Sequence, residues 1–269
     1  MPFTDFCDPI MDDSVPITST VNEIIELGKR SNWKYLELRT GKFSIPETNR
    51  STFFYRHSLS LTEDEGGIFS RLSNNTQRNV KKAIREAVTI DISDTFESVK
   101  KYYYLHCLTR KRHGIPPQSL NFFRKIHQNI ISKGYGFTIL ARHQQRIIAG
   151  AMYFHFGDQA LYKFGASDIR YRKYRSNSLV MWEAIKWYAK NKYVHFDFGR
   201  TESFNDGLRR FKLGWGAREN IVNYYKYDLK HNIYLNENEM VYPPVKFLIQ
   251  KMPIVLLRMA GRLIYKHVG

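Results

Sequence analysis

The residues best suited to chemistry lie in one stretch, 196–217, where a strand-like segment runs into a basic loop punctuated by glycines. Side chains of an extended strand alternate between two faces, so His195 and Asp197 should share one face and Phe196 and Phe198 the other. A histidine and a carboxylate that point the same way can accept and deliver a proton. We therefore take His195 and Asp197 as candidates for organising a reaction site or moving a proton.

The loop after this strand carries several cations. Cationic groups at the carboxyl end of a strand in an α/β sheet are where an anionic ligand or a developing oxyanion would be met. The alternative is structural, with Asp197 pairing with a cation only to hold the loop. Both interpretations stay open at this point. The cations of the loop are Arg200, Arg209, Arg210 and Lys212.

A second basic run, 168–177, directly precedes a largely apolar segment that is typical of a buried helix, 177–191. Backbone N–H groups at the start of a helix can bind phosphate, and nearby basic side chains would help. The run contains no glycine, and it could equally be a solvated loop. The candidate phosphate-binding residues are Arg172, Lys173, Arg175 and Asn177.

Composition narrows the class of protein. With 43% hydrophobic and 15% aromatic residues the chain is not of the disordered type. Its net charge of +17 favours an anionic partner, which could be nucleic acid, a nucleotide-linked substrate or an acidic membrane face. Cys7 and Cys107 stand in no metal-binding spacing, so we expect no metal site, no disulfide framework and a reducing compartment.

No apolar run reaches the roughly 20 residues that a membrane span needs, and the first residues are acidic where a signal peptide is basic. The expected location is therefore cytoplasmic. Residues 241–269 contain no acidic residue and predict a basic amphipathic helix, which would either lie on an anionic inner membrane face or dock on the domain. Its basic and apolar positions are Arg258, Arg262 and Lys266 beside Leu256, Met259 and Leu263.

The elements that must position these residues follow from hydrophobic periodicity and from turn residues. The pattern predicts an α/β fold whose mixed central sheet carries helices on both faces. An initial α/β fragment, a boundary at 62–67 and a basic helix at 73–88 precede the order β-α-α-β-β-β-α-β-α-β. In that order the segments are 89–92, 94–113, 120–132, 136–142, 146–156, 160–166, 177–191, 193–198, 208–213 and 220–229; the initial fragment has a helix at 21–30 and strands at 33–39 and 51–59.

Five segments in this order resemble the Fem-like branch of the GNAT acyltransferase superfamily. The resemblance covers roughly residues 68–230, and it is the combined order and spacing that is specific. The segments are LSNNTQR at 72–78, TRKRHGIPPQ at 109–118, YKFGAS at 162–167, SNSLVMWEA at 176–184, and FDFGR followed by GLRRFKLGWGA within 196–217.

The resemblance implies a GNAT fold and an aminoacyl transfer from a charged tRNA to the amine of a peptidoglycan precursor. Fem-family enzymes have a Phe-Lys pair near the reacting ester, which Phe211 and Lys212 match. Lys212 would then stabilise the tetrahedral oxyanion, with Asp197 and His195 as further catalytic candidates. The expected substrate contacts are Phe211, Arg200, Arg209, Tyr162, Lys163, Arg78 and Arg110, and Arg56 and His106 would join them if they face the acceptor cleft.

Fem-family enzymes carry two GNAT-like domains, and residues 3–9 resemble the middle of the first. The expected organisation is therefore a partial N-terminal GNAT-like half-domain at 1–66, the acyltransferase domain at 67–230 and the basic tail at 231–269. The half-domain would be completed by a preceding segment or by a second copy of the chain in a homo-oligomer.

These observations predict a cell-envelope N-acyltransferase that acts on a nucleotide- or lipid-linked peptidoglycan or surface-polysaccharide precursor. It would hold no bound cofactor and take either aminoacyl-tRNA or acyl-CoA as donor, with CoA disfavoured by the missing glycine turn. One alternative is an acetyl-CoA-dependent N-acetyltransferase acting on an amino sugar. Another is a degenerate, non-catalytic GNAT module that binds RNA or membrane through its charge.

Overall fold

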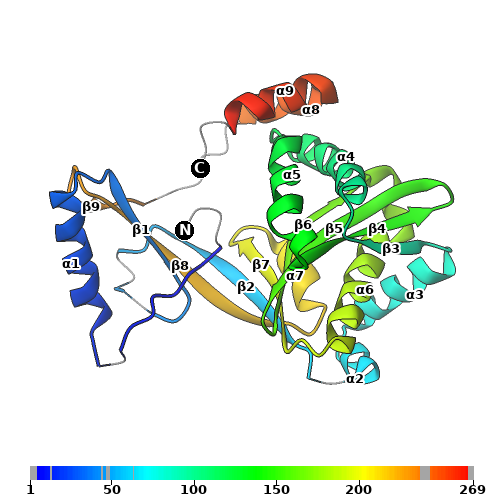
Figure 1. Cartoon of the computed structure of the whole chain (residues 1–269), viewed down its shortest axis with the longest axis horizontal. Coiled ribbons are helices and arrows are strands. Elements are labelled where there is room, and N and C mark those ends of the chain that lie inside the picture. The colour runs from blue at the N-terminus through cyan, green and yellow to red at the C-terminus, as the bar shows by residue number, and fades with distance from the viewer. Residues whose placement is uncertain are drawn as a thin grey trace. The chain divides into compact units, whose positions relative to one another are not determined.

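The computed structural model describes residues 5–12, 14–43, 45–46, 49–62, 64–236 and 243–265 of the 269-residue chain (Figure 1). The chain divides into two compact units, each built from segments that are distant in sequence. Unit 1 comprises Met1–His57, Arg200–Phe211 and Arg218–Val241, and unit 2 comprises Ser58–Gly199, Lys212–Ala217 and Tyr242–Gly269.

A partial second domain confined to residues 1–66 is not evident among the described residues. The residues before Ser58 form a compact unit only together with segments that follow Gly199. The predicted boundaries at 66 and 230 divide the chain into three continuous segments. Each compact unit instead consists of several segments that are separate in sequence. Those boundaries stay a prediction about domains, and the two units are described separately below.

Unit 2 contains most of a mixed sheet. Strands β3 to β6 are neighbours in antiparallel order, and β6 then pairs in parallel with β7, which continues from unit 2 into unit 1. The bounds are β3 Thr89–Ser93, β4 Gly136–His143, β5 Arg146–Phe156, β6 Gln159–Ser167 and β7 His195–Glu202. The predicted order of strands and helices is confirmed. Strand β7 runs beyond the predicted end at 198, to Glu202, and has β2 as its other neighbour in the sheet.

Helices cover both faces of this sheet, as predicted. Helices α4 (Phe96–His113) and α5 (Leu120–Asn129) lie over one face, where Met152 of β5 belongs to their buried cluster. The next residue, Tyr153, must point to the opposite face, and its hydroxyl donates to the Val180 carbonyl oxygen of α6 (Ser176–Lys190) at 3.4 Å. Helix α3 (Asn74–Arg85) packs against α6 on that second face.

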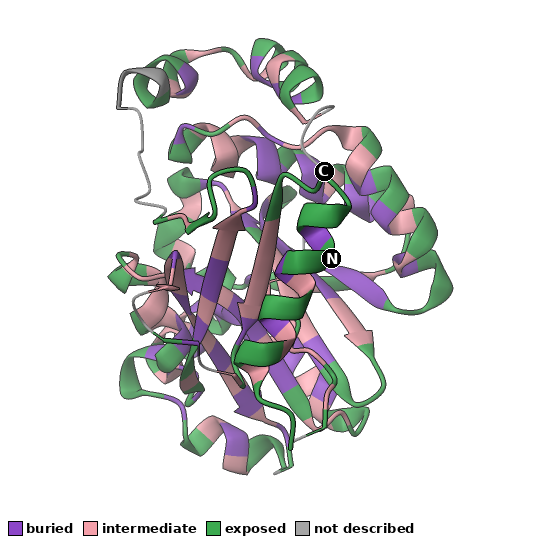
Figure 2. Cartoon of the chain, turned by 90° about the vertical axis from the view of Figure 1, so that its left-hand side faces the viewer, coloured by how far each residue is buried: buried purple, intermediate pink, exposed green. Residues whose placement is uncertain are grey.

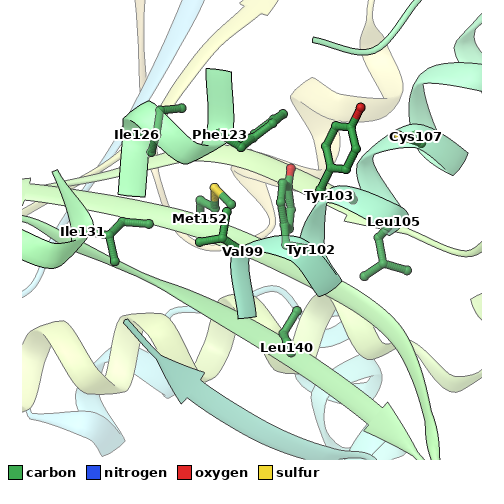
Figure 3. Packing of buried hydrophobic residues seen from close by; sticks show 11 residues of the cluster. Val99, Tyr102, Tyr103, Leu105, Cys107, Phe123, Ile126, Ile131, Leu140 and Met152 are labelled. Atoms are coloured by element: carbon green, nitrogen blue, oxygen red, sulfur yellow. The ribbon is translucent and has the colours of Figure 1, made fainter. Parts of the chain in front are cut away.

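Aromatic and aliphatic side chains together form the core under α4 and α5 (Figure 3). Tyr102 and Phe123 are fully buried and lie with their ring centroids 5.8 Å apart. Local signals set the ends of α4: the Thr95 hydroxyl accepts from the Ser98 N–H at its start, and Gly114 ends it in the left-handed conformation. These ends hold the helix in register over the sheet, so its buried face meets α5.

The predicted boundary segment 62–67 contains the start of a short helix. Helix α2 (Glu65–Ser70) begins there because the Asp64 carboxylate accepts from the Gly67 N–H at 2.7 Å and Ile68 is buried. The following helix α3 starts as predicted, with the Ser73 hydroxyl accepting from the Thr76 N–H. An acidic, glycine-rich sequence is therefore compatible with a short capped helix.

Unit 1 contains α1, three strands that pair through β8, and the start of α7, which ends in unit 2. Strand β8 pairs antiparallel with both β1 and β9 and also neighbours β2. Helix α1 buries Val21 and Ile25 with Tyr225 and Leu229 and exposes its other face, a distribution of burial that Figure 2 shows across the chain. The bounds are α1 Ile17–Arg30, β1 Tyr35–Thr40, β2 Thr52–Ser60, α7 Asp206–Leu213, β8 Arg218–Asp228 and β9 Ile233–Tyr234.

The tail forms two helices, α8 (Pro243–Lys251) and α9 (Ile254–Ile264), both in unit 2. Lys266 lies outside the described residues. Leu257 of α9 is fully buried, and the Tyr265 hydroxyl just beyond the helix accepts from the Arg110 guanidinium of α4 at 2.7 Å. Across the parts of the chain that the structure describes, none of the helices is long and apolar enough to cross a membrane.

Gly136 marks a close approach of the two central strands of unit 2. A Cβ added there would lie 2.4 Å from the Tyr153 carbonyl oxygen, a backbone atom that cannot move without shifting β5. Gly136→Ala is therefore expected to lower the free energy of unfolding by about 1–3 kcal/mol in urea titrations. Gly66→Ala in α2, whose nearest atom is 3.7 Å away, is the control and should be neutral or slightly stabilising. Equal free energies of unfolding for the two variants would contradict the conclusion that the strands leave no room for a Cβ at Gly136.

Candidate active site

Strands β6 and β7 separate toward their carboxyl ends. Their parallel pairing joins Gln159 to His195, Ala160 to Phe196 and Leu161 to Asp197, and no further β6–β7 pair follows among the described residues. Because paired strands lie about 4.8 Å apart, strands that stop pairing open a gap in the sheet. Such a gap is a natural place for an extended acyl group to enter.

A β-bulge lies directly beyond the last of these pairs. Met152 of β5 stands opposite Phe164 of β6, whereas the next residue, Tyr153, stands opposite Tyr162, so Lys163 is the extra residue on β6. Bulges bend a strand and are frequent beside active sites. Tyr162 and Lys163, two predicted substrate contacts, are thus placed where β6 leaves β7. Burial raises the pKa of Tyr162 to about 12, so its phenol is protonated at neutral pH.

The end of β6 is held by a residue for which the sequence suggested no role. The Thr109 hydroxyl of α4 accepts from the Ser167 N–H at 3.0 Å and donates to the Ser167 carbonyl oxygen at 3.2 Å. Asn177, at the start of α6, donates to the Ser167 hydroxyl at 3.2 Å. Thr109 and Ser167 both lie inside the segments that carry the family resemblance, and that placement was the available signal.

The basic run between β6 and α6 forms a 3-10 turn, Ile169–Tyr174, followed by Arg175 in the left-handed conformation. No side chain caps α6, so its first N–H groups and the positive end of its dipole face the loop. The Asp168 carboxylate instead binds Arg170, whose hydrogen bonds lower the pKa of that carboxyl. The predicted phosphate-binding residues therefore surround an uncapped helix start; Arg172, Lys173, Arg175 and Asn177 are all exposed.

Lys212 and Asp197 both form hydrogen bonds with the backbone of Gly199 in β7. The Lys212 ammonium donates to the Gly199 carbonyl oxygen at 2.8 Å, and the Asp197 carboxylate accepts from the Gly199 N–H at 2.6 Å. Gly199 has a φ of 69°, a conformation that favours glycine. Lys212 is only 2% exposed, although burying an ammonium costs several kcal/mol unless it is well paired. Its position thus brings a buried positive charge to the strand that borders the gap.

The other predicted catalytic residue, His195, lies at the beginning of β7, four residues before Gly199. It is exposed at the beginning of β7, opposite Gln159, and Asp197 is half-buried two residues further along. Phe196 and Phe198, which alternate with them along the strand, are buried, so the predicted alternation of faces is confirmed. His195 is therefore accessible to solvent, whereas Asp197 is engaged by the Gly199 amide.

The segment that follows Lys212 is anchored to the loop before α3. The Gly214 carbonyl oxygen accepts from the Ser73 N–H at 2.9 Å, and Trp215 is fully buried. Gly216, with a φ of 73°, lies close to the Arg71 carbonyl oxygen. These contacts hold the end of α7, and with it the backbone of Lys212, against the loop before α3.

Two of the predicted loop cations have partners inside unit 1. Arg200 donates to the Tyr224 hydroxyl at 2.8 Å and lies over the Phe54 ring. Arg209 makes a bidentate ion pair with Glu219 at 2.7 and 2.6 Å, and this pairing lowers the pKa of Glu219. Both arginines are therefore ordered by their own unit. Phe211, the neighbour of Lys212, is half-buried, and its predicted substrate contact stays a prediction.

The remaining predicted contacts differ in their surroundings: one is exposed, and the others contact neighbouring groups or are buried. Arg78 is exposed on α3, and Arg56 lies over the Phe6 ring of unit 1. Arg110 donates to the Pro116 carbonyl oxygen and to Tyr265, so it links α4 to the tail. His106, a contact only on the condition that it faces the cleft, is 5% exposed within the core under α4, where burial above all lowers its pKa to about 4.

Known proteins share the sequence pattern and the fold of this chain. The sequence model of the family described as Acetyltransferase (GNAT) domain matches residues 70–227, more than half of the chain. No curated protein matches. The fold is similar to the crystal structure of FemX, at 13% identity and a TM-score of 0.60 over 87% of this chain and 79% of that chain.

Two further structures are similar at the level of the fold. One is the C-terminal domain of a putative lysylphosphatidylglycerol synthetase from Agrobacterium fabrum, at 13% identity and a TM-score of 0.58 over 91% of this chain and 79% of that one. The other is L-PGS from Bacillus licheniformis, at 12% identity and a TM-score of 0.54 over 90% and 77%. The resemblance predicted from the sequence motifs is confirmed for the fold, and the chain belongs to the GNAT acetyltransferase family.

Proposed function

We propose that this protein transfers an acyl or aminoacyl group to an amine of a cell-envelope precursor. The observation that carries the proposal is the separation of β6 from β7 directly after Leu161, with the bulge at Lys163. The donor's carbonyl would lie in this gap, between the separated ends of β6 and β7. A buried ammonium borders the same gap, because Lys212 is bound to Gly199 of β7.

In the proposed reaction the acceptor amine attacks the carbonyl carbon of the donor. A tetrahedral oxyanion forms, and its collapse expels the ribose hydroxyl of a tRNA or the thiolate of CoA while the amine loses a proton. The Lys212 charge would stabilise the oxyanion, and Asp197 or His195 would organise the site or receive the proton. Holding donor and acceptor together would supply a large part of the acceleration.

The favoured donor is aminoacyl-tRNA. The run 168–177 has no glycine turn for a pyrophosphate, and its exposed cations suit a polyanion. The similarity of the fold to FemX agrees with a Fem-like role, and peptidoglycan or surface-polysaccharide precursors are the acceptors that this role implies. A second candidate is an acetyl-CoA-dependent N-acetyltransferase, which the uncapped start of α6 favours as a phosphate site.

Binding of donors to the intact chain tests the proposal. Tryptophan fluorescence or calorimetry would follow separate titrations with total tRNA and with acetyl-CoA at physiological salt. We expect saturable binding of tRNA, and Arg172→Gln with Lys173→Gln to weaken it about 10- to 100-fold by removing two charge-assisted contacts. The pair Lys190→Gln and Lys192→Gln, exposed near the other end of α6, is the control for lost charge.

The outcomes separate the candidates. Micromolar binding of acetyl-CoA with no response to tRNA would replace aminoacyl transfer by acetyl transfer. Binding of neither donor would overturn both and leave the non-catalytic module. A loss of tRNA affinity that is equal in the control pair would mean that binding follows net charge, and the loop 168–177 would then not be the donor site.

A further inference from the structure

The α8–α9 tail of unit 2 presents an exposed apolar surface. Leu257 is buried and Gly261 lies against the Pro117 carbonyl oxygen, so one side of α9 is docked on the domain. Seven large hydrophobic residues on other sides of the two helices each expose at least half of their surface. They are Phe247, Leu248, Val255, Leu256, Met259, Leu263 and Ile264.

The exposed residues of α9 form a stripe with arginines on its edge. At 100° per residue, Val255, Leu256, Met259 and Leu263 fall within about 100° of one another on the helix surface. Arg258 and Arg262 lie along one border of that stripe. An apolar stripe flanked by cations is the arrangement of a helix that lies in a membrane interface.

A groove opens beside this border, between α5 and α9. It has a volume of about 950 Å³, and no acidic residue contributes to its described lining. Arg258 lies over the Tyr103 ring and Arg124 over the Phe96 ring, so aromatic residues support two of its cations. The basic residues that line the groove are Arg124, Lys125, Arg258 and Arg262.

We propose that this surface binds an anionic phospholipid bilayer, with headgroup phosphates in the α5–α9 groove and the stripe of α9 between the headgroups. Charge complementarity and the aliphatic character of the stripe favour lipid over RNA, because single-stranded RNA is bound by stacking on aromatic side chains. No acidic residue stands between Pro243 and Ile264 to repel an anionic surface. The proposal does not depend on which donor the active site takes.

Sedimentation of the full chain with vesicles tests this surface. We expect binding to vesicles of phosphatidylcholine mixed with phosphatidylglycerol, little binding to phosphatidylcholine alone, and weaker binding at high salt. Replacing Lys125 and Arg262 by glutamine should lower the partition coefficient about tenfold or more, because each cation near an anionic surface contributes about 1 kcal/mol. The exposed pair Lys81→Gln and Arg85→Gln on α3 removes the same charge elsewhere and should change it far less.

The apolar stripe has its own variant. Val255→Ser, Met259→Ser and Leu263→Ser together should abolish vesicle binding while urea unfolding is unchanged, since these side chains are exposed, and Ile84→Ser on α3 is the apolar control. Equal losses in both charge pairs, or full binding by the serine variant, would overturn the proposal. So would tRNA binding that falls with Lys125→Gln and Arg262→Gln while vesicles are not bound, which would make the groove an RNA site.

Discussion

Replacing Lys212 by methionine is expected to lower kcat for acyl transfer by about 10²–10³-fold, the usual cost of losing one donor to a tetrahedral oxyanion. Methionine keeps an unbranched stem in the buried site and removes only the charge and its donors. Affinity for the donor should stay nearly unchanged, because the interaction strengthens only as the oxyanion forms. Single-turnover rates and donor titrations on the same preparation would separate the two effects.

The obvious objection is that Lys212 only ties α7 to β7 through Gly199. A purely structural lysine would, when replaced, lower the free energy of unfolding by about 1–3 kcal/mol, because the Gly199 carbonyl oxygen would lose its donor. It would not reduce kcat in the protein that remains folded. Urea unfolding of Lys212→Met measures the first effect, and transfer at a temperature well below the transition measures the second.

Lys190→Met is the matched control. Lys190 is an exposed lysine in the last turn of α6, and its replacement removes the same charge from the same unit. If Lys190→Met keeps the wild-type kcat while Lys212→Met loses most of it, the loss is due to the place of Lys212 in the site and not to the removal of one positive charge. Retained transfer in a folded Lys212→Met protein would remove the oxyanion role and leave the gap between β6 and β7 as the main source of catalysis.

Local patterns predicted the helices and strands of unit 2 because the signals for those elements are local. Ser73 caps α3 through a contact three residues away, and the alternation of His195, Phe196 and Asp197 follows from strand geometry. The order of strands and helices then follows from where these signals occur along the chain. The motif around Lys212 also led to a buried lysine of α7 that binds the strand bordering the gap.

Several of the predicted contact residues have partners that local sequence patterns do not reveal. Arg209 is bound by Glu219 on β8, and Arg110 by Tyr265 beyond α9, 155 positions away. His106 lies on the buried face of α4. Aromatic residues occur on almost every side of this helix, so helical periodicity alone did not separate the buried face of α4 from its exposed face. The extra residue at Lys163 depends on the register between two strands, and no pattern within one strand reveals it.

The burial of His106 makes the stability of the protein depend on pH. Its ring lies 4.9 Å from the Phe123 ring, and Nε2 is 2.8 Å from the Gln118 side-chain oxygen. Burial first, and then the charge of Arg110, lower its pKa from 6.5 to about 4. The unfolded chain therefore binds a proton at His106 below pH 6.5, whereas the folded chain does not until about pH 4.

The stability that His106 contributes is thus fully present above pH 6.5 and is lost as the pH falls toward about 4, by about 3 kcal/mol in all. We expect urea titrations at a series of pH values to show this loss in the wild type and a profile flatter by that amount in His106→Gln. Glutamine cannot titrate but can still donate to Gln118. His113→Gln, an exposed position at the end of the same helix, controls for removal of an imidazole from α4. Parallel profiles for the wild type and His106→Gln would mean that the imidazole is protonated inside the folded protein, with the core under α4 open enough to hydrate it.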